Sequence, residues 1–280
     1  MTSIRESFEQ GLTISVYGCT FELRTSAVIS LESIIEHLPP TWRINPNDGV
    51  VPYRLLIETT AESTDCWKIT INGVQSRQIC GWGTLLDTIE NAMQMYIAEF
   101  ATPYLFVHAG VVAWNGTAIL LPGRSFAGKS TLVTSLVQAG ATYYSDEYAV
   151  LDDEGRVWPY RRRVSLRNGP HGLARRLDLA RDDAPCEPLP VSLIALLQYT
   201  PGGSWHVERR TPGEAIMRLV DQTVAVRHRP ADTLAYLSRL IENAIVIEGT
   251  RGEVDDSVRR LLLAAEQDAT YHSIPLTTAE

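Results

Sequence analysis

The segment Gly123–Thr131, which reads GRSFAGKST, constrains the fold of this 280-residue chain more than any other part of it. It matches the pattern GxxxxGK[ST], a glycine-rich loop whose backbone N–H groups surround phosphate oxygens. An apolar run at Thr117–Leu121 precedes the loop and a helical pattern at Lys129–Gln138 follows it. This strand–loop–helix order predicts an α/β core over residues 101–280, with the loop at the carboxyl edge of a parallel sheet.

Lysine is scarce in this chain, because Lys68 and Lys129 are the only lysines among its 25 basic residues. One of the two occupies the position that the phosphate-loop pattern requires. We expect Lys129 to reach the β- and γ-phosphates of a nucleoside triphosphate such as ATP, and Ser130 to offer its hydroxyl to Mg²⁺. The expected nucleotide-binding residues are Gly123, Ser125, Phe126, Ala127, Gly128, Lys129, Ser130 and Thr131.

The charge and hydropathy of the chain indicate which kinds of partner to expect. The formal net charge is −8, from 25 Lys and Arg against 33 Asp and Glu, so a chain-wide basic surface for nucleic acid is absent. No apolar run is long enough to span a bilayer. We therefore expect neither a nucleic-acid partner nor a membrane association.

The four cysteines are Cys19, Cys66, Cys80 and Cys186. They form no CxxC pair and have no histidine cluster at zinc spacing, so we expect four reduced, structural thiols. The first residues, Met1–Gly11, are charged and lack the apolar centre of a signal peptide. Both observations favour a cytoplasmic protein.

Residues 1–100 are expected to form an N-terminal α+β module. Its strongest pattern is the amphipathic helix Leu85–Phe100, while Ser30–His37 predicts a short helix. Turn residues at Asn45–Gly49 and at Asn72-Gly73 separate β-rich runs. The predicted strands are Thr13–Val16, Thr20–Arg24, Tyr53–Thr59 and Trp67–Asn72. The module carries no chemical motif, so we expect it to bind an acceptor or to form a homo-oligomer contact.

In the C-terminal part, Asn115-Gly116 predicts a tight hairpin turn, and Val191–Tyr199 is an apolar run typical of a strand buried on both faces. The further predicted strands are Phe106–Ala113, Thr142–Tyr144, Ala149–Leu151 and Val157–Tyr160. The further predicted helices are Ala215–Val220, Leu234–Glu242 and Ser257–Glu266.

An acidic pair, Asp146-Glu147, follows the predicted strand Thr142–Tyr144. Because the carboxyl ends of neighbouring parallel strands meet at one crevice, this pair is expected near the γ-phosphate. One carboxylate would accept the proton of a substrate hydroxyl, and the other would help to hold Mg²⁺. An acidic turn on a solvated edge is the competing interpretation.

Three segments together resemble the catalytic core of the HPr kinase/phosphorylase family. They are His108-Ala109-Gly110, the phosphate loop, and Ala139–Glu147. The likeness is greater to the compact HPr-kinase-related serine kinases of peptide natural-product clusters, such as those for lasso peptides. The Glu-Ile-Arg-Gly-Leu-Gly segment of true HPr kinases is missing, so HPr itself is not the expected acceptor.

The resemblance implies a role for each site residue. Asp146 would be the general base, His108 its orienting or proton-accepting partner, and Glu147 and Ser130 would lie around Mg²⁺. Arg163 and Arg167 alternate with Ser165 and so share one strand face, where they are expected to bind the acceptor.

The expected function is therefore that of an ATP- and Mg²⁺-dependent kinase acting on a hydroxyl, that of serine in a peptide or protein. Two alternatives stay open at this point. One is a nucleotide-responsive regulatory or binding module, and the other is a kinase for a small-molecule hydroxyl. A kinase needs the phosphate loop, the acidic pair and His108 around one site, whereas a binding module does not.

Overall fold

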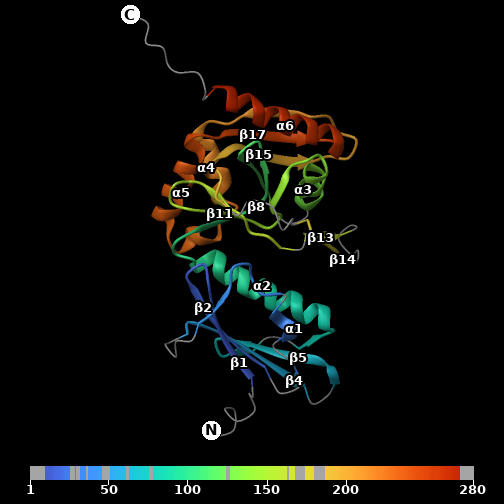
Figure 1. Ribbon diagram of the computed structural model, residues 1–280, viewed down its shortest axis with the longest axis vertical. Helices are drawn as coiled ribbons and strands as arrows, with labels where there is room; N and C mark the ends of the chain where they lie inside the picture. Colours follow the sequence, from blue (N-terminus) through green and yellow to red (C-terminus); the bar gives the residue numbers. More distant parts are fainter. Residues whose placement is uncertain are drawn as a thin grey trace, which may run out of the picture. The chain divides into compact units, whose positions relative to one another are not determined.

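The computed structural model describes residues 10–25, 29, 32–35, 37–45, 51–60, 63–75, 78–123, 127–162, 164–167, 174–179 and 187–271. The chain separates into two compact units, Met1–Pro103 and Tyr104–Glu280 (Figure 1). The molecule is of mixed α/β class, with six α-helices and two large mixed sheets in the part described. None of the helices in these residues is both long and apolar enough to cross a membrane.

The sheet of the N-terminal unit has the strand order β3-β1-β2-β4-β5-β6, with β7 paired to β5. Its strands are β1 (Gln10–Val16), β2 (Cys19–Thr25), β3 (Arg43–Ile44), β4 (Tyr53–Thr60), β5 (Ser63–Ile71), β6 (Val74–Gln75) and β7 (Ile79–Cys80). Alternate residues of β2 are buried, as in a sheet with one face in the core. The four predicted strands of this unit are confirmed with shifted ends.

Helix α2 (Trp82–Phe100) confirms the predicted helix and begins three residues earlier. It packs on the buried sheet face through Tyr96, whose ring lies 4.1 Å from Tyr53 and 5.3 Å from Phe21. The Tyr53 hydroxyl also donates a hydrogen bond to the Ala92 carbonyl of this helix. Aromatic packing of this kind contributes about 0.5–1.5 kcal/mol per pair beyond the area buried.

The remaining local predictions of this unit have mixed outcomes. Helix α1 (Glu32–Ile35) lies inside the predicted helix Ser30–His37, of which residues 30, 31 and 36 are outside the described residues. The turn at Asn72-Gly73 is confirmed, with φ of 47° and 83°. Residues 46–49 of the other predicted turn are outside the described residues.

The prediction of four reduced thiols is wrong. Cys66 and Cys80 form a disulfide, with Cα atoms 4.1 Å apart. They face each other directly in the antiparallel pairing of β5 with β7, a register that their sequence spacing did not reveal. Cys19 is a buried thiol, and Cys186 lies outside the described residues.

The sheet of the C-terminal unit has the order β12-β11-β8-β9-β15-β17-β16, and β10 also pairs with β8. Its strands are β8 (Leu105–Trp114), β9 (Thr117–Pro122), β10 (Thr142–Ser145), β11 (Tyr148–Leu151), β12 (Val157–Trp158), β15 (Val191–Tyr199), β16 (His206–Arg209) and β17 (Ile245–Arg251). A separate hairpin joins β13 (Val164–Arg167) to β14 (Ala174–Leu177).

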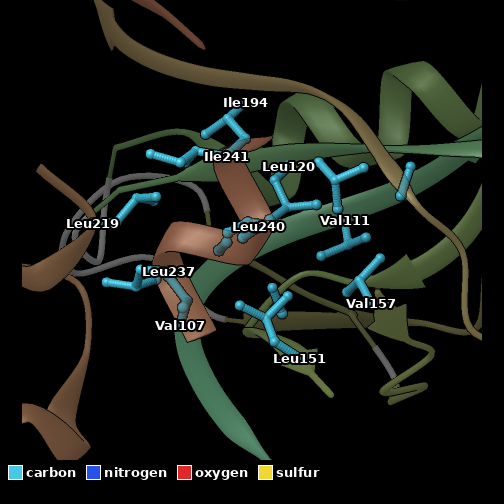
Figure 2. Close-up of a cluster of buried hydrophobic side chains, with 14 of the residues drawn as sticks. Val107, Val111, Leu120, Leu151, Val157, Ile194, Leu219, Leu237, Leu240 and Ile241 are labelled. Carbon is cyan, nitrogen blue, oxygen red and sulfur yellow. The ribbon is translucent and has the colours of Figure 1, made fainter. Parts of the chain in front are cut away.

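Helices cover both faces of this sheet. The helices are α3 (Lys129–Gln138), α4 (Pro212–Val220), α5 (Pro230–Glu242) and α6 (Val254–Tyr271). One apolar core joins the sheet to α3 and α6, and a second joins it to α4 and α5. Figure 1 shows α4 and α5 on the opposite side of the sheet from α3. Figure 2 shows the second core, where Leu237 and Leu240 of α5 meet Val107 of β8.

The expectation of a parallel sheet is only partly correct. β9, β15 and β17 are parallel neighbours, whereas β8, β10, β11, β12 and β16 pair antiparallel. The Asn115-Gly116 turn, with φ of 48° and 79°, reverses the chain between β8 and β9 and so makes the sheet mixed. Since β10 is antiparallel to β8, it runs in the same direction as β9, and both strands end at the same edge.

Candidate functional site

The phosphate-loop segment lies where the expected strand and helix meet. β9 ends at Pro122 and α3 begins at Lys129. Gly128 has a φ of 79°, in the left-handed region, and a Cβ atom there would lie 2.6 Å from Arg251 Nη2. The backbone conformation therefore favours glycine at this position, and a Cβ atom would also displace the end of the Arg251 side chain. Ser125 and Phe126 lie outside the described residues.

Lys129 folds back across the start of the loop. Its ammonium group donates a hydrogen bond of 2.7 Å to the Gly123 carbonyl, and its Nζ lies 3.3 Å from His108 Nε2. The side chain is buried, which lowers its pKa, while the carboxylates of Glu147 and Asp146 act in the opposite direction. A cation is thus held at the place where the sequence pattern predicts contact with phosphate.

Asp146 is connected to the phosphate loop through Ser130. Its Oδ2 accepts a hydrogen bond of 3.0 Å from the Ser130 hydroxyl, and its Oδ1 accepts one of 3.0 Å from the Tyr143 hydroxyl. The carboxylate is only 8% exposed. Burial raises its pKa, and the hydrogen bonds from Tyr143 and Ser130 oppose that shift.

A break in strand pairing turns the acidic pair toward the loop. β10 and β11 pair one after the other with β8, and an irregularity precedes Ser145. The Ser145 hydroxyl accepts hydrogen bonds from the backbone N–H groups of Glu147 and Tyr148, at 3.2 and 3.1 Å. The Ala109 N–H donates to the Glu147 carbonyl at 3.1 Å. Asp146 and Glu147 therefore sit at a fixed interruption opposite the middle of β8.

His108 is paired differently from what the family resemblance implies. Its Nε2 lies 3.6 Å from Glu147 Oε1, and no contact joins it to Asp146 within the part of the chain described. Tyr148 faces His108 across the strands, with the two ring centres 5.9 Å apart, and Glu147 immediately precedes it, at the interruption before β11. Burial and the Lys129 charge lower the pKa of His108 to about 4, so the ring is neutral at pH 7.

The remaining predicted residues contribute less. Thr131 is exposed on α3. Arg163 and the side chain of Arg167 lie outside the described residues, so the expected acceptor contact stays a prediction.

Arg251 is a site residue that the sequence analysis missed. It is only 3% exposed and is the last residue of β17, a strand that was not predicted. Its Nη2 donates a hydrogen bond of 3.4 Å to the Gly128 carbonyl, and its guanidinium lies 4.9 Å from the centre of the Tyr199 ring. No described carboxylate forms an ion pair with it. The available signal was the short apolar run Ile245–Ile247 before Gly249-Thr250-Arg251.

The oxygen donors at the loop suit Mg²⁺, but in a different arrangement from the one that the resemblance implies. Ser130 is bonded to Asp146, the expected base, whereas Glu147, the expected metal residue, lies beside His108. The Asp146 carboxylate and the Ser130 hydroxyl are adjacent hard oxygen donors, and Mg²⁺ is usually held by one or two carboxylates together with substrate phosphates. Among the residues described, no group of three His, Cys, Asp or Glu side chains forms a cage for a metal ion.

No protein-family model matches this chain, and no curated protein sequence matches it.

Proposed function

We propose that this protein is an ATP- and Mg²⁺-dependent kinase that transfers the γ-phosphate to a hydroxyl, that of serine in a peptide or protein. The observation that supports the proposal is that two sets of interacting side chains meet at the phosphate loop. Ser130 is bonded to Asp146, and Lys129 lies beside His108, which lies beside Glu147. A nucleotide-binding module has no need of two carboxylates next to its phosphate loop.

In the proposed reaction the protein positions the reactants and neutralises charge. The loop N–H groups and Lys129 bind the phosphates. Ser130 and one carboxylate of the acidic pair would hold Mg²⁺, which offsets the negative charge on the β- and γ-phosphate oxygens. Arg251 stabilises the loop through the Gly128 carbonyl.

The acceptor hydroxyl oxygen forms a bond to the γ-phosphorus, and the bond from that phosphorus to the bridging oxygen breaks, leaving its electron pair on ADP. The hydroxyl proton passes to a carboxylate of the acidic pair. The family resemblance implies Asp146 for this role, and Glu147, which is 38% exposed, is the second carboxylate within reach of the loop. His108 is neutral at pH 7, so it orients Glu147 as a polar neighbour and does not add a second cation.

The decisive experiment incubates the purified chain with [γ-³²P]ATP, Mg²⁺ and a degenerate peptide pool with one fixed serine. A kinase labels the peptides with alkali-labile phosphate, as expected for phosphoserine. Binding of the fluorescent nucleotide mant-ATP without label transfer to the pool would contradict the proposal and favour the nucleotide-responsive module. Label transfer to glycerol or another small alcohol, but not to the pool, would favour a small-molecule kinase.

A further inference from the structure

A groove of about 770 Å³ opens beside the phosphate loop, within the C-terminal unit. One side is the loop at Gly123 and Ala127. The other sides are the ends of β15 and β17, at residues 196–199 and 248–250, and the region around the end of α4. Among the described residues of the expected nucleotide site and acidic pair, only Gly123 and Ala127 line it. The groove therefore offers a surface that the phosphate-binding residues leave unused.

The β15 side of the groove is an open strand edge. Pairing of β15 with β9 ends at Ile194 opposite Leu120, whereas its pairing with β17 continues to Tyr199 opposite Arg251. β9 runs two residues past Leu120 and ends at Pro122, which has no N–H group to give to a ladder, and the chain then turns into the loop. Among the described residues, no strand covers 197–199 on the β9 side. An edge of this kind presents backbone donors and acceptors to an added strand.

One end of the groove meets the proposed reaction site. Gln222, which lines the groove, accepts a hydrogen bond of 2.8 Å at its carbonyl from the His108 N–H. Gly123, on the facing wall, donates from its N–H to the His108 carbonyl and accepts from Lys129. A ligand in the groove would thus have its end next to the residues that surround the transferred phosphate.

The far wall of the groove is polar. Arg210 and Arg218 both bind Glu248, through Nε atoms at 2.8 and 3.1 Å, and Asp221 lies beside them. A nucleoside base usually enters a mainly apolar slot with a few polar groups, whereas an extended peptide needs hydrogen-bonding partners along its length. Apolar side chains, Leu196 and Leu197 among them, line the groove together with these charged ones, so it is the open strand edge that favours the peptide.

We infer that this groove binds the acceptor as an extended peptide segment, which adds to the open edge of β15 and presents its hydroxyl beside Gly123. The inference rests on the proposed kinase function and adds the substrate class and the docking surface. The nucleoside of ATP is the competing occupant of the same groove, and the test separates the two.

The test uses two neighbouring, exposed residues of α4 as a matched pair. Arg218 lines the groove and is 55% exposed at its side chain, while Met217 does not line it and is 67% exposed. Arg218→Trp should fill the groove, and Met217→Trp should add the same indole outside it. The probes are a fluorescein-labelled, serine-containing degenerate peptide pool, read by anisotropy, and mant-ATP.

We expect Arg218→Trp to raise the Kd for the peptide pool at least tenfold and to leave the Kd for mant-ATP within twofold. Met217→Trp should leave both within twofold. In the wild type, the peptide pool should slow hydrogen exchange of the amides in 196–199. The inference would be overturned if the wild type did not bind the peptide pool, or if both variants bound it equally. It would also be overturned if the pool slowed hydrogen exchange only at amides outside 196–199. Loss of mant-ATP affinity in Arg218→Trp alone would instead assign the groove to the nucleoside.

The outcomes also separate this inference from the proposed function. If the wild type binds the pool in the groove but transfers no ³²P to it, the kinase proposal fails and the peptide site stands. If the wild type labels the pool, and both tryptophan variants bind and label it equally, the kinase proposal stands and the groove is not the peptide site.

Discussion

The two units differ in where they keep charged side chains. Among the residues described, the N-terminal unit buries no charged side chain, whereas the C-terminal unit buries Lys129, Asp146, Asp152 and Arg251. The N-terminal unit holds its charges on an outer face, where Glu22 pairs with Arg24 and with Arg54. Exposed pairs of this kind contribute about 0–1 kcal/mol each.

The four buried charges have two different explanations. Asp152 accepts hydrogen bonds from the backbone N–H groups of Glu154 and Arg156 and from the Trp158 indole, so it holds a turn together. The other three lie at one loop and are bonded mostly to neutral groups. Burying an ion costs several kcal/mol unless good partners compensate. Three buried charges at one place are what the proposed binding of a charged nucleotide requires, and the described residues of the N-terminal unit hold no such cluster.

The largest expected effect concerns the buried lysine. Lys129→Ala should weaken mant-ATP binding at least about a hundredfold and reduce label transfer below detection, because the cation that offsets phosphate charge is gone. The melting temperature should stay the same or rise, since burial lowers the pKa of Lys129 and so disfavours its charge in the folded state. The matched control is Lys68→Ala, which removes the chain's other, exposed lysine. Equal nucleotide affinity in the Lys129 and Lys68 variants would contradict the assignment of the buried lysine to phosphate binding.

The next effect separates the two buried aspartates. Asp146→Asn should reduce phosphate transfer by roughly 100- to 10,000-fold and keep ATP affinity close to wild type, because the amide keeps the shape but accepts no proton. Asp152→Asn should leave transfer unchanged and lower the free energy of unfolding by roughly 2 kcal/mol through weaker hydrogen bonds. A Mg²⁺ titration of Asp146→Asn adds a further readout, since a raised Mg²⁺ requirement assigns Asp146 to the metal. Unchanged transfer would leave Asp146 as a turn residue.

A third effect concerns the stability of the N-terminal unit alone. The Cys66–Cys80 disulfide closes a loop with a sequence separation of 14, and its loss should cost about 3 kcal/mol of unfolding free energy by loop entropy. We expect the double variant Cys66→Ser with Cys80→Ser to unfold at lower denaturant concentration while mant-ATP affinity stays at the wild-type value. Mass spectrometry of free thiols checks that the bond is present in the starting protein. A large loss of nucleotide affinity in the double variant would show that nucleotide binding depends on the N-terminal unit, contrary to this prediction.

The smallest effect is a pH dependence from His108. Its pKa of about 4 in the folded state lies below the ordinary value of 6.5, so the unfolded chain takes up this proton first as the pH falls. Stability should therefore decrease between about pH 6.5 and pH 4, by roughly 1 kcal/mol at pH 5.5 from this group. His108→Gln should show a shallower decline in melting temperature over the same range. Parallel pH profiles for the wild type and the variant would contradict the assigned burial of the imidazole.

Much of the fold could be predicted from local patterns. The Asn115-Gly116 turn, the helix Lys129–Gln138 and the strand Val191–Tyr199 have strong short-range signals, and each is confirmed. The mixed direction of the sheet, the short strands β6 and β7 and the Cys66–Cys80 bond depend on which strands meet in space. Strand pairing joins residues far apart in sequence, and a single sequence carries little record of it.

The candidate site shows the same division. The loop pattern and the acidic pair predicted that Lys129, Ser130 and Asp146 lie at one site. In the structure Ser130 donates a hydrogen bond to Asp146, and the neighbouring Lys129 donates one to Gly123 at the start of the loop. The partner of His108 depended on the register of β11 against β8, which the sequence did not indicate. Arg251 comes from a strand more than 100 residues after the loop, so no spacing rule linked it to Gly128.

Gly110 has an evolutionary consequence. A Cβ atom at this position would lie 2.6 Å from Val133 Cγ2, so the strand β8 and the helix α3 touch where β8 has no side chain. Its φ is not in the left-handed region, so the backbone itself would accept alanine. During evolution, substitutions at positions 110 and 133 are therefore expected to occur in a preferred order. A methyl group at 110 requires Val133 to move or to become smaller, so a smaller residue at 133 makes alanine at 110 easier to accept, and alanine at 110 disfavours a return to valine at 133.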